Sequence, residues 1–217
     1  MMAEIKKGMK LIRYGYGLKT NLSMGILFAI VGILMLGCDG NYPMLGIIYI
    51  MLAPTMLIQL ESTLLYSGMT AASSKRRLLE IVLPDFLTII TGVLGCAAVV
   101  GVGWFWAGVR QESTDACMEI MLGSGLLVAI MLIYFGSVYK YFIVSVILFV
   151  IAMIIGMGSG VVIVKLVGEK LNMLTVSMLC TALIIIGIVI SCWLRRVCYR
   201  KQISLLAAGM YLRKALQ

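Results

Sequence analysis

Residues 67–80 read Ser67-Gly-Met-Thr-Ala-Ala-Ser-Ser-Lys-Arg-Arg-Leu-Leu-Glu80, and this short polar stretch decides how the chain is arranged. Two long apolar runs flank it, at 43–66 and 81–109. The cations at 75–77 cannot lie at the centre of a bilayer, because each charge there costs several kcal/mol. The stretch therefore predicts a loop at a membrane surface, and its positive charge indicates the cytoplasmic side.

The composition agrees with a chain that lies mostly in lipid. Of the 217 residues, 62% are hydrophobic and only 12% are charged, and the mean hydropathy is +1.09. Soluble domains are typically about half apolar and about a quarter charged. The sequence predicts an all-α polytopic membrane protein with about six spans of roughly 20 residues. We expect no soluble enzyme domain within this length.

The apolar runs define the expected organisation of this single transmembrane domain. Six spans are predicted, at 21–38, 44–66, 81–109, 120–138, 142–164 and 173–194. Residues 1–20 interleave five cations with aliphatic and tyrosine side chains, a pattern typical of an amphipathic helix lying in the interface. Residues 67–80 form the cytoplasmic loop, and residues 195–217 form a basic tail.

The distribution of Lys and Arg predicts the orientation. With six spans, Arg110, Lys165 and Lys170 fall on one side, and the other fifteen of the 18 cations fall on the opposite side. Positively charged short segments remain cytoplasmic, so both termini are expected inside. The net charge of +9 is then explained by topology and by attraction to anionic membrane lipid, and no nucleic-acid partner is expected.

The cysteines do not suggest a metal site. The chain has no histidine, and its six cysteines have no CxxC spacing. Zinc sites need clustered Cys, His or carboxylate ligands, so we expect no metal. The cysteines are interpreted as small apolar side chains. A pairing of Cys38 with Cys117, both near predicted outer loops, stays open as the alternative.

The residue inventory also argues against an enzyme. Without histidine, a serine nucleophile lacks its usual base, and Asp85 stands alone where an aspartyl protease needs two carboxylates. The chain has no GxxxxGK[ST] motif and therefore no ATP site of its own. Residues 156–160, Gly-Met-Gly-Ser-Gly, lie in an apolar run and favour close helix packing or a bend.

Glu61 is the clearest carboxylate inside a predicted span. An ionisable residue within the membrane is a functional hypothesis by default, so Glu61 is a candidate for a gate, a polar path or a proton relay. It lies near the cytoplasmic end of its span, so an interfacial residue that reaches lipid head groups is the other interpretation. Gln59 is the other candidate for the gate or the substrate path, although it lies two residues away and faces differently on a helix.

The cytoplasmic loop carries the second candidate site. Lys75, Arg76 and Arg77 follow Ser73 and Ser74 and precede an immediate return into the membrane. Topology and lipid binding alone would account for the three charges. Their position also suits a short surface helix that a soluble partner could push.

In its layout and in residues 70–80, the chain resembles the permease subunit of bacterial type-2 ATP-binding-cassette exporters without a fused ATPase. Ser74, Lys75 and Arg76 match the polar part of that family's coupling-helix pattern, whereas Ala71 and Ala72 replace its leucine-proline. The resemblance implies an elbow helix at 1–19 and ATPase contact through residues 73–77. It also implies a location in the bacterial plasma membrane.

The same resemblance implies the partners. A cytosolic ATPase subunit would supply the ATP and Mg²⁺ sites, and a second copy or a related permease would complete the transporter. The expected substrates are amphipathic peptides, such as antimicrobial or phenol-soluble-modulin-like peptides, or lipophilic compounds. Two other classes stay open: a non-transporting membrane protein, such as an immunity or assembly factor, and a proton-coupled secondary transporter.

Overall fold

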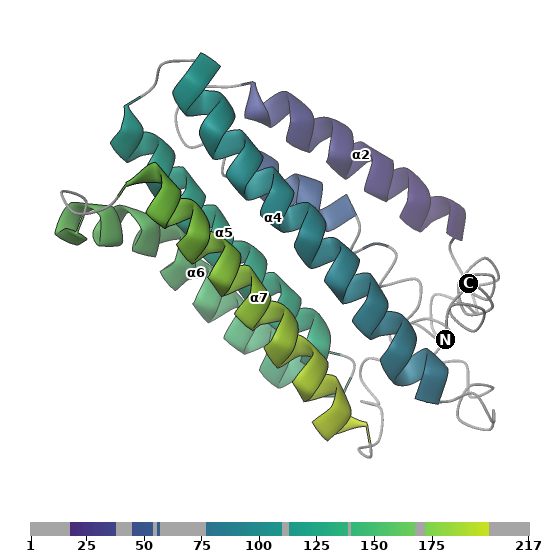
Figure 1. Cartoon of the computed structure of the whole chain (residues 1–217). Helices are drawn as coiled ribbons and strands as arrows, with labels where there is room; N and C mark the ends of the chain where they lie inside the picture. Colours follow the sequence, from purple (N-terminus) through teal and green to yellow (C-terminus); the bar gives the residue numbers. More distant parts are fainter. Residues whose placement is uncertain are drawn as a thin grey trace.

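The computed structural model of the chain is helical throughout its regular elements. It describes residues 18–37, 45–53, 56, 77–109, 113–138, 140–167 and 172–199. The elements are α2 (Leu18–Leu36), the π-helical turn η1 (Leu78–Val82), α4 (Leu83–Val109), α5 (Thr114–Ser137), α6 (Phe142–Val167) and α7 (Met173–Cys198). Residues 45–53 are also helical. The long helices run roughly alongside one another in one bundle (Figure 1).

Local sequence explains where several of these helices begin and end. The Ser113 hydroxyl accepts a hydrogen bond from the Ala116 backbone N–H at 3.3 Å and caps the start of α5. Pro84 and Asp85 lie in the first turn of α4, which continues without a break from the π-helical turn η1. The missing N–H of Pro84 therefore falls where the hydrogen bonding changes from π-helical to α-helical. Arg195 and Arg196 lie in the last turn of α7, which favours positive charge.

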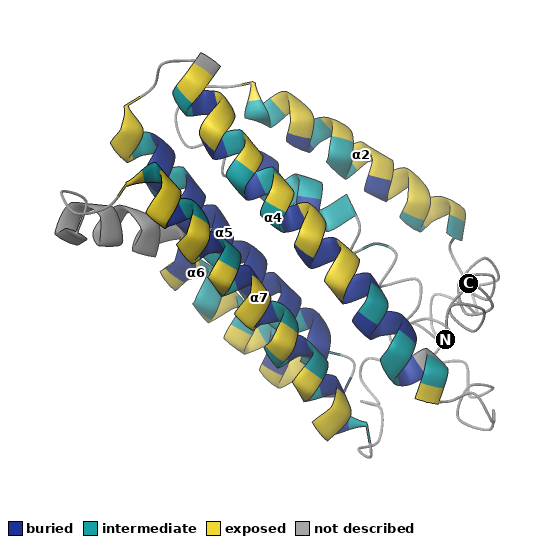
Figure 2. Cartoon of the chain, viewed as in Figure 1, coloured by how far each residue is buried: buried dark blue, intermediate teal, exposed yellow. Residues whose placement is uncertain are grey.

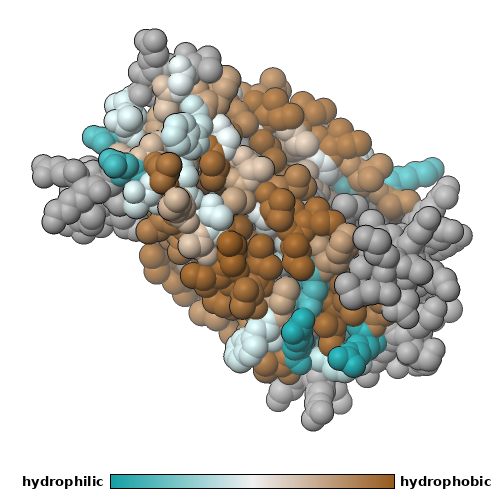
Figure 3. All heavy atoms as spheres, in the orientation of Figure 1, coloured by the Kyte–Doolittle hydropathy of each residue, from teal (hydrophilic) through white to brown (hydrophobic). Residues whose placement is uncertain are grey.

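Four helices in the described part of the chain are long and apolar enough to cross a membrane. They are Leu18–Leu36, Glu80–Gly108, Thr114–Ser137 and Met173–Cys198, and Ile143–Gly156 is a shorter apolar helix. Their outward faces carry large hydrophobic side chains, including those of Leu34, Val93 and Ile154. Hydrophobic atoms cover the middle of the face in Figure 3, and hydrophilic atoms gather toward its two ends. This surface suits lipid and not water.

Helix α5 is the central helix of the bundle. It packs against α4, α6 and α7, and most of its length is buried (Figure 2). Helices α4 and α5 run antiparallel, because Gly92 lies beside Leu132 and Gly103 lies beside Met121. Helices α5 and α7 run in the same direction, since Gly125 packs on Cys180 and Gly136 packs on Ser191 further along both helices.

Glycines form the closest helix contacts. A Cβ atom added at Gly136 would lie 2.8 Å from the Ser191 carbonyl oxygen, and one added at Gly187 would lie 2.9 Å from the Ala129 Cα. A Cβ at Gly32 would lie 2.8 Å from the Gly46 carbonyl oxygen in segment 45–53. Small residues allow helix backbones to approach in lipid, where association depends on packing contacts.

The predicted all-α membrane fold is confirmed. The described residues place helix in each of the six predicted ranges, although the boundaries differ: α5 begins at Thr114, six residues early, and α7 continues to Cys198. Helix α6 continues through 156–160, and Gly156 packs against Leu127. The six-span count, the interfacial helix at 1–20 and the cytoplasmic termini stay predictions, because residues 1–17, 57–76 and 200–217 lie outside the described residues.

Candidate functional site

Two ionic contacts meet where α4 begins. The first joins α4 to α7: the Arg195 guanidinium lies 3.3 Å from one oxygen of Asp85, and the Arg196 guanidinium lies 3.6 Å from the other. Arg195 also donates a hydrogen bond of 3.5 Å to the Phe135 carbonyl oxygen of α5. Arg195 is only 1% exposed and Asp85 is 8% exposed. The carboxylate is therefore held between a buried cation and a solvent-facing one.

The second contact joins the turn before α4 to the connection between α5 and α6. Glu80, in η1, lies 3.5 Å from the Lys140 ammonium group, and both side chains are almost fully buried. Lys140 lies in the short turn after α5. Its backbone N–H donates a hydrogen bond to the Ser137 carbonyl oxygen. The start of α4 is thus attached to α7 by Asp85 and to the α5–α6 turn by Glu80.

These ion pairs connect the start of α4 to the end of α7 and to the α5–α6 turn. A buried ion pair contributes little net stability over an apolar replacement, but removing one partner leaves an uncompensated buried charge and is strongly destabilising. The contacts therefore hold three separate chain segments in one arrangement. Movement of the η1 turn would be resisted by Lys140, and movement of the first turn of α4 would be resisted by Arg195.

Further polar side chains of α4 and α7 lie near these pairs in the sequence. Within the described ranges, the buried hydroxyls of Thr88 and Ser191 have no hydrogen-bond partner. Thr88 follows Asp85 by about one turn, and Ser191 precedes Arg195 by about one turn. Farther along the same two helices, Cys96 and Thr181 approach to 3.5 Å, and Trp104 donates to Ser177 at 3.1 Å.

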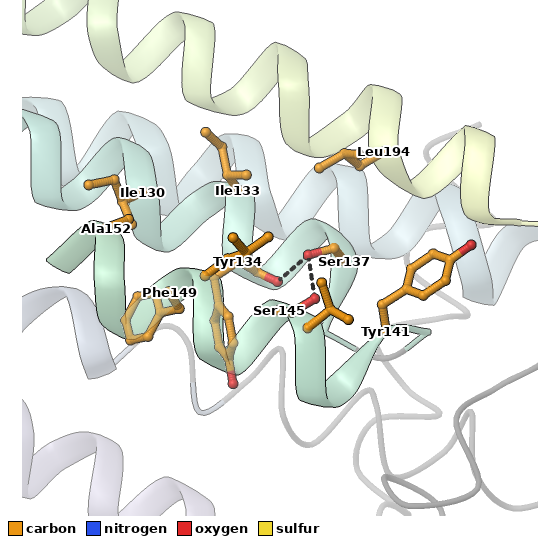
Figure 4. Close-up of a pocket in the computed structure, with 11 residues that line it drawn as sticks. Ile130, Ile133, Tyr134, Ser137, Tyr141, Ser145, Phe149, Ala152 and Leu194 are labelled. Atoms are coloured by element: carbon orange, nitrogen blue, oxygen red, sulfur yellow. Dashed lines mark hydrogen bonds between the residues drawn. The ribbon is translucent and has the colours of Figure 1, made fainter.

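A cavity lies between α5 and α6, next to the turn that connects them. It has a volume of about 340 Å³ and is lined mostly by apolar side chains of α5 and α6, with Leu194 of α7 at one edge. Its polar part is a hydrogen-bonded serine pair, in which the Ser137 and Ser145 hydroxyl oxygens lie 2.9 Å apart (Figure 4). Tyr134 and Phe149 pack together on one wall, with ring centres 4.5 Å apart. Such a site suits an apolar group with a small polar end.

The predicted site residues are only partly placed. Arg77 is described, and its exposed side chain lies at the start of η1, three residues before Glu80. Ser73, Ser74, Lys75 and Arg76 lie outside the described residues, and so do Glu61 and Gln59. Cys117 is buried in α5, while its proposed partner Cys38 also lies outside them. In the described part of the chain, no group of three His, Cys, Asp or Glu side chains could hold a metal.

The sequence pattern does not reveal the two ion-pair clusters. It suggests that Asp85 stands alone, that Glu80 belongs to the loop, and that Arg195 and Arg196 belong to the tail. The structure corrects this view, because Asp85 contacts both arginines and Glu80 contacts Lys140. A signal was present in the predicted topology, which already placed 80, 85, 140 and 195 at the same membrane surface.

The apolar helices, their buried glycine contacts and the ionic end together define an all-α membrane protein. Comparisons of the chain with protein-family models, with curated proteins and with solved structures find no match.

Proposed function

We propose that this chain is the permease subunit of an ATP-driven exporter in the bacterial plasma membrane. A separate ATPase subunit would bind and hydrolyse ATP with Mg²⁺, and this chain would form the membrane path. Two copies, or one copy and a related permease, would enclose that path. The proposal extends the sequence resemblance to type-2 ATP-binding-cassette exporters.

The observation that carries this proposal is the continuity between the basic loop and the ionic network. The cations at 75–77 end in the exposed Arg77, and Glu80 follows within one helical turn and contacts Lys140. A partner that pushed the loop would act directly on the η1 turn. Through Glu80 and Asp85, that push would reach the α5–α6 turn and the end of α7.

The apolar cavity supports the proposed substrate class. Its walls are aliphatic and aromatic, and its polar groups include the Ser137–Ser145 pair. An amphipathic peptide could place an apolar side chain there, and a lipophilic compound could occupy the same volume. Apolar walls with few, well-placed polar groups are typical of sites for such ligands.

The placement of buried charge favours this proposal over proton-coupled transport. A proton relay uses ionisable groups near the middle of the membrane. The pairs at Glu80 and Asp85 instead lie at the start of a long apolar helix, and Arg195 lies in the last turn of another. They are placed to connect segments at a surface.

The test is to recover the tagged chain from its native host in mild detergent and identify its partners by mass spectrometry. We expect a roughly stoichiometric ATP-binding-cassette ATPase. Reversing Lys75, Arg76 and Arg77 to glutamate should remove the ATPase, whereas reversing Arg200, Arg213 and Lys214 should retain it. Recovery of the chain alone in several detergents would instead favour the non-transporting class, such as an immunity or assembly factor.

A further inference from the structure

The outward face of α7 is an apolar stripe that ends in an aromatic ring and a cation. Met178, Ile185 and Val189 lie along this stripe, and Trp193 is 60% exposed at its charged end. Arg196 follows three residues later, so the two side chains lie on the same face of the helix. The Arg196 side chain is 69% exposed.

The charges at this end of α7 do not balance. Asp85 carries one formal negative charge and faces two guanidinium groups, Arg195 at 3.3 Å and Arg196 at 3.6 Å. Arg195 also bonds to a backbone carbonyl and is buried, so it satisfies Asp85 in the interior. The surplus positive charge therefore falls on the exposed Arg196.

We propose that Arg196 and Trp193 bind an anionic phospholipid, with the phosphate on the Arg196 guanidinium and one acyl chain along the apolar stripe of α7. Arginine presents several N–H donors in a planar fork that matches phosphate oxygens. Tryptophan rings concentrate at the level of the lipid head groups. The stripe beyond Trp193 supplies the apolar surface that the acyl chain needs.

This site differs from the buried ionic network beside it. When a phosphate group binds Arg196, Asp85 keeps its contact with Arg195, and α4 stays attached to α7. The Arg195 side chain is 2% exposed and cannot reach a head group. The lipid site consequently depends on Arg196, and this inference does not depend on the transport proposal.

The test uses purified full-length chain in phosphatidylcholine vesicles, with brominated phosphatidylglycerol or brominated phosphatidylcholine as a short-range quencher of Trp193. A Trp193→Phe variant identifies the signal of this ring among the three tryptophans. We expect the brominated anionic lipid to be preferred beside Trp193 by about fivefold, the effect of one cation near a charged membrane surface. Arg196→Gln should remove that preference, and Arg196→Lys should keep only part of it, because an ammonium group is a cation without the planar fork.

Lys19→Gln is the matched control, because Lys19 is an exposed cation on α2 and not on α7. It should leave the preference unchanged. Thermal unfolding in phosphatidylcholine verifies that the variants fold. The proposal is overturned if a folded Arg196→Gln variant keeps the full preference for anionic lipid. It is also overturned if Lys19→Gln reduces that preference as much as Arg196→Gln does. Loss of the preference on adding inorganic phosphate, but not chloride at equal ionic strength, would assign the site to a soluble anion and also overturn it.

Discussion

Asp85 and Arg195 are 110 residues apart in the sequence and 3.3 Å apart in the structure. One lies in the first turn of α4 and the other in the last turn of α7, so their contact requires the two helices to run antiparallel with a defined register. Gly92 against Ile188 and Trp104 against Ser177 continue the same register along the helices. The ion pair is therefore the charged end of a long interface.

Removing one partner of this pair should be much more harmful than removing both. Asp85→Ala leaves Arg195 buried without its carboxylate and should cost about 3–5 kcal/mol of unfolding free energy. The double variant Asp85→Leu with Arg195→Met should recover most of that loss. Reversible unfolding in mixed micelles measures both values.

Arg196→Gln serves as the control for that comparison. Arg196 forms the exposed ion pair with Asp85. Exposed ion pairs contribute about 0–1 kcal/mol to the free energy of unfolding. If Arg196→Gln destabilised the chain as strongly as Asp85→Ala, the division between a buried and an exposed arginine would be wrong.

Glu80 and Lys140 should show a direct energetic coupling. We expect Glu80→Gln and Lys140→Met to be individually destabilising, and a double-mutant cycle should give an interaction free energy of about 0.5–3 kcal/mol. The charge swap Glu80→Lys with Lys140→Glu should restore part of the stability. A coupling near zero would show that the η1 turn is not held by the α5–α6 connection.

Glycine substitutions test the contact between α5 and α7. Gly136→Ala would place a Cβ atom 2.7 Å from the Ser191 hydroxyl oxygen and 2.8 Å from its carbonyl oxygen. Forcing the helices apart should cost about 1–3 kcal/mol. Gly101→Ala is the matched control, since nothing lies within 4 Å of its added Cβ. It should be neutral or stabilise by up to about 1 kcal/mol, because alanine favours helix.

A cross-link tests the register of α4 on α7. The Cys96 sulfur lies 3.5 Å from the Thr181 hydroxyl oxygen, so Thr181→Cys should form a disulfide with Cys96 when a membrane-permeant oxidant is added. The chain used should have its other five native cysteines replaced. Ser177→Cys, about one turn away, should react poorly with Cys96, and equal yields from both variants would contradict the register. Proteolysis followed by reducing and non-reducing gels measures the link.

Much of the fold could be predicted because apolar residues in long runs have few alternatives in lipid. A span must satisfy its own backbone hydrogen bonds, so the runs at 81–109, 142–164 and 173–194 had to be helical. The candidate site was harder, because loop charge indicates a membrane surface but not which side chains meet there.

Hydropathy and the positions of charge were sufficient to determine that this chain is an all-α membrane protein, since transfer into lipid depends on local composition. They also placed Glu80, Asp85, Lys140 and Arg195 near one surface. Only the tertiary structure decided that these four residues form two buried pairs, and that α5 is the central helix. Ion pairing and glycine contacts depend on helix rotation and register to within a few ångströms, and those quantities are set by the packing of all helices together.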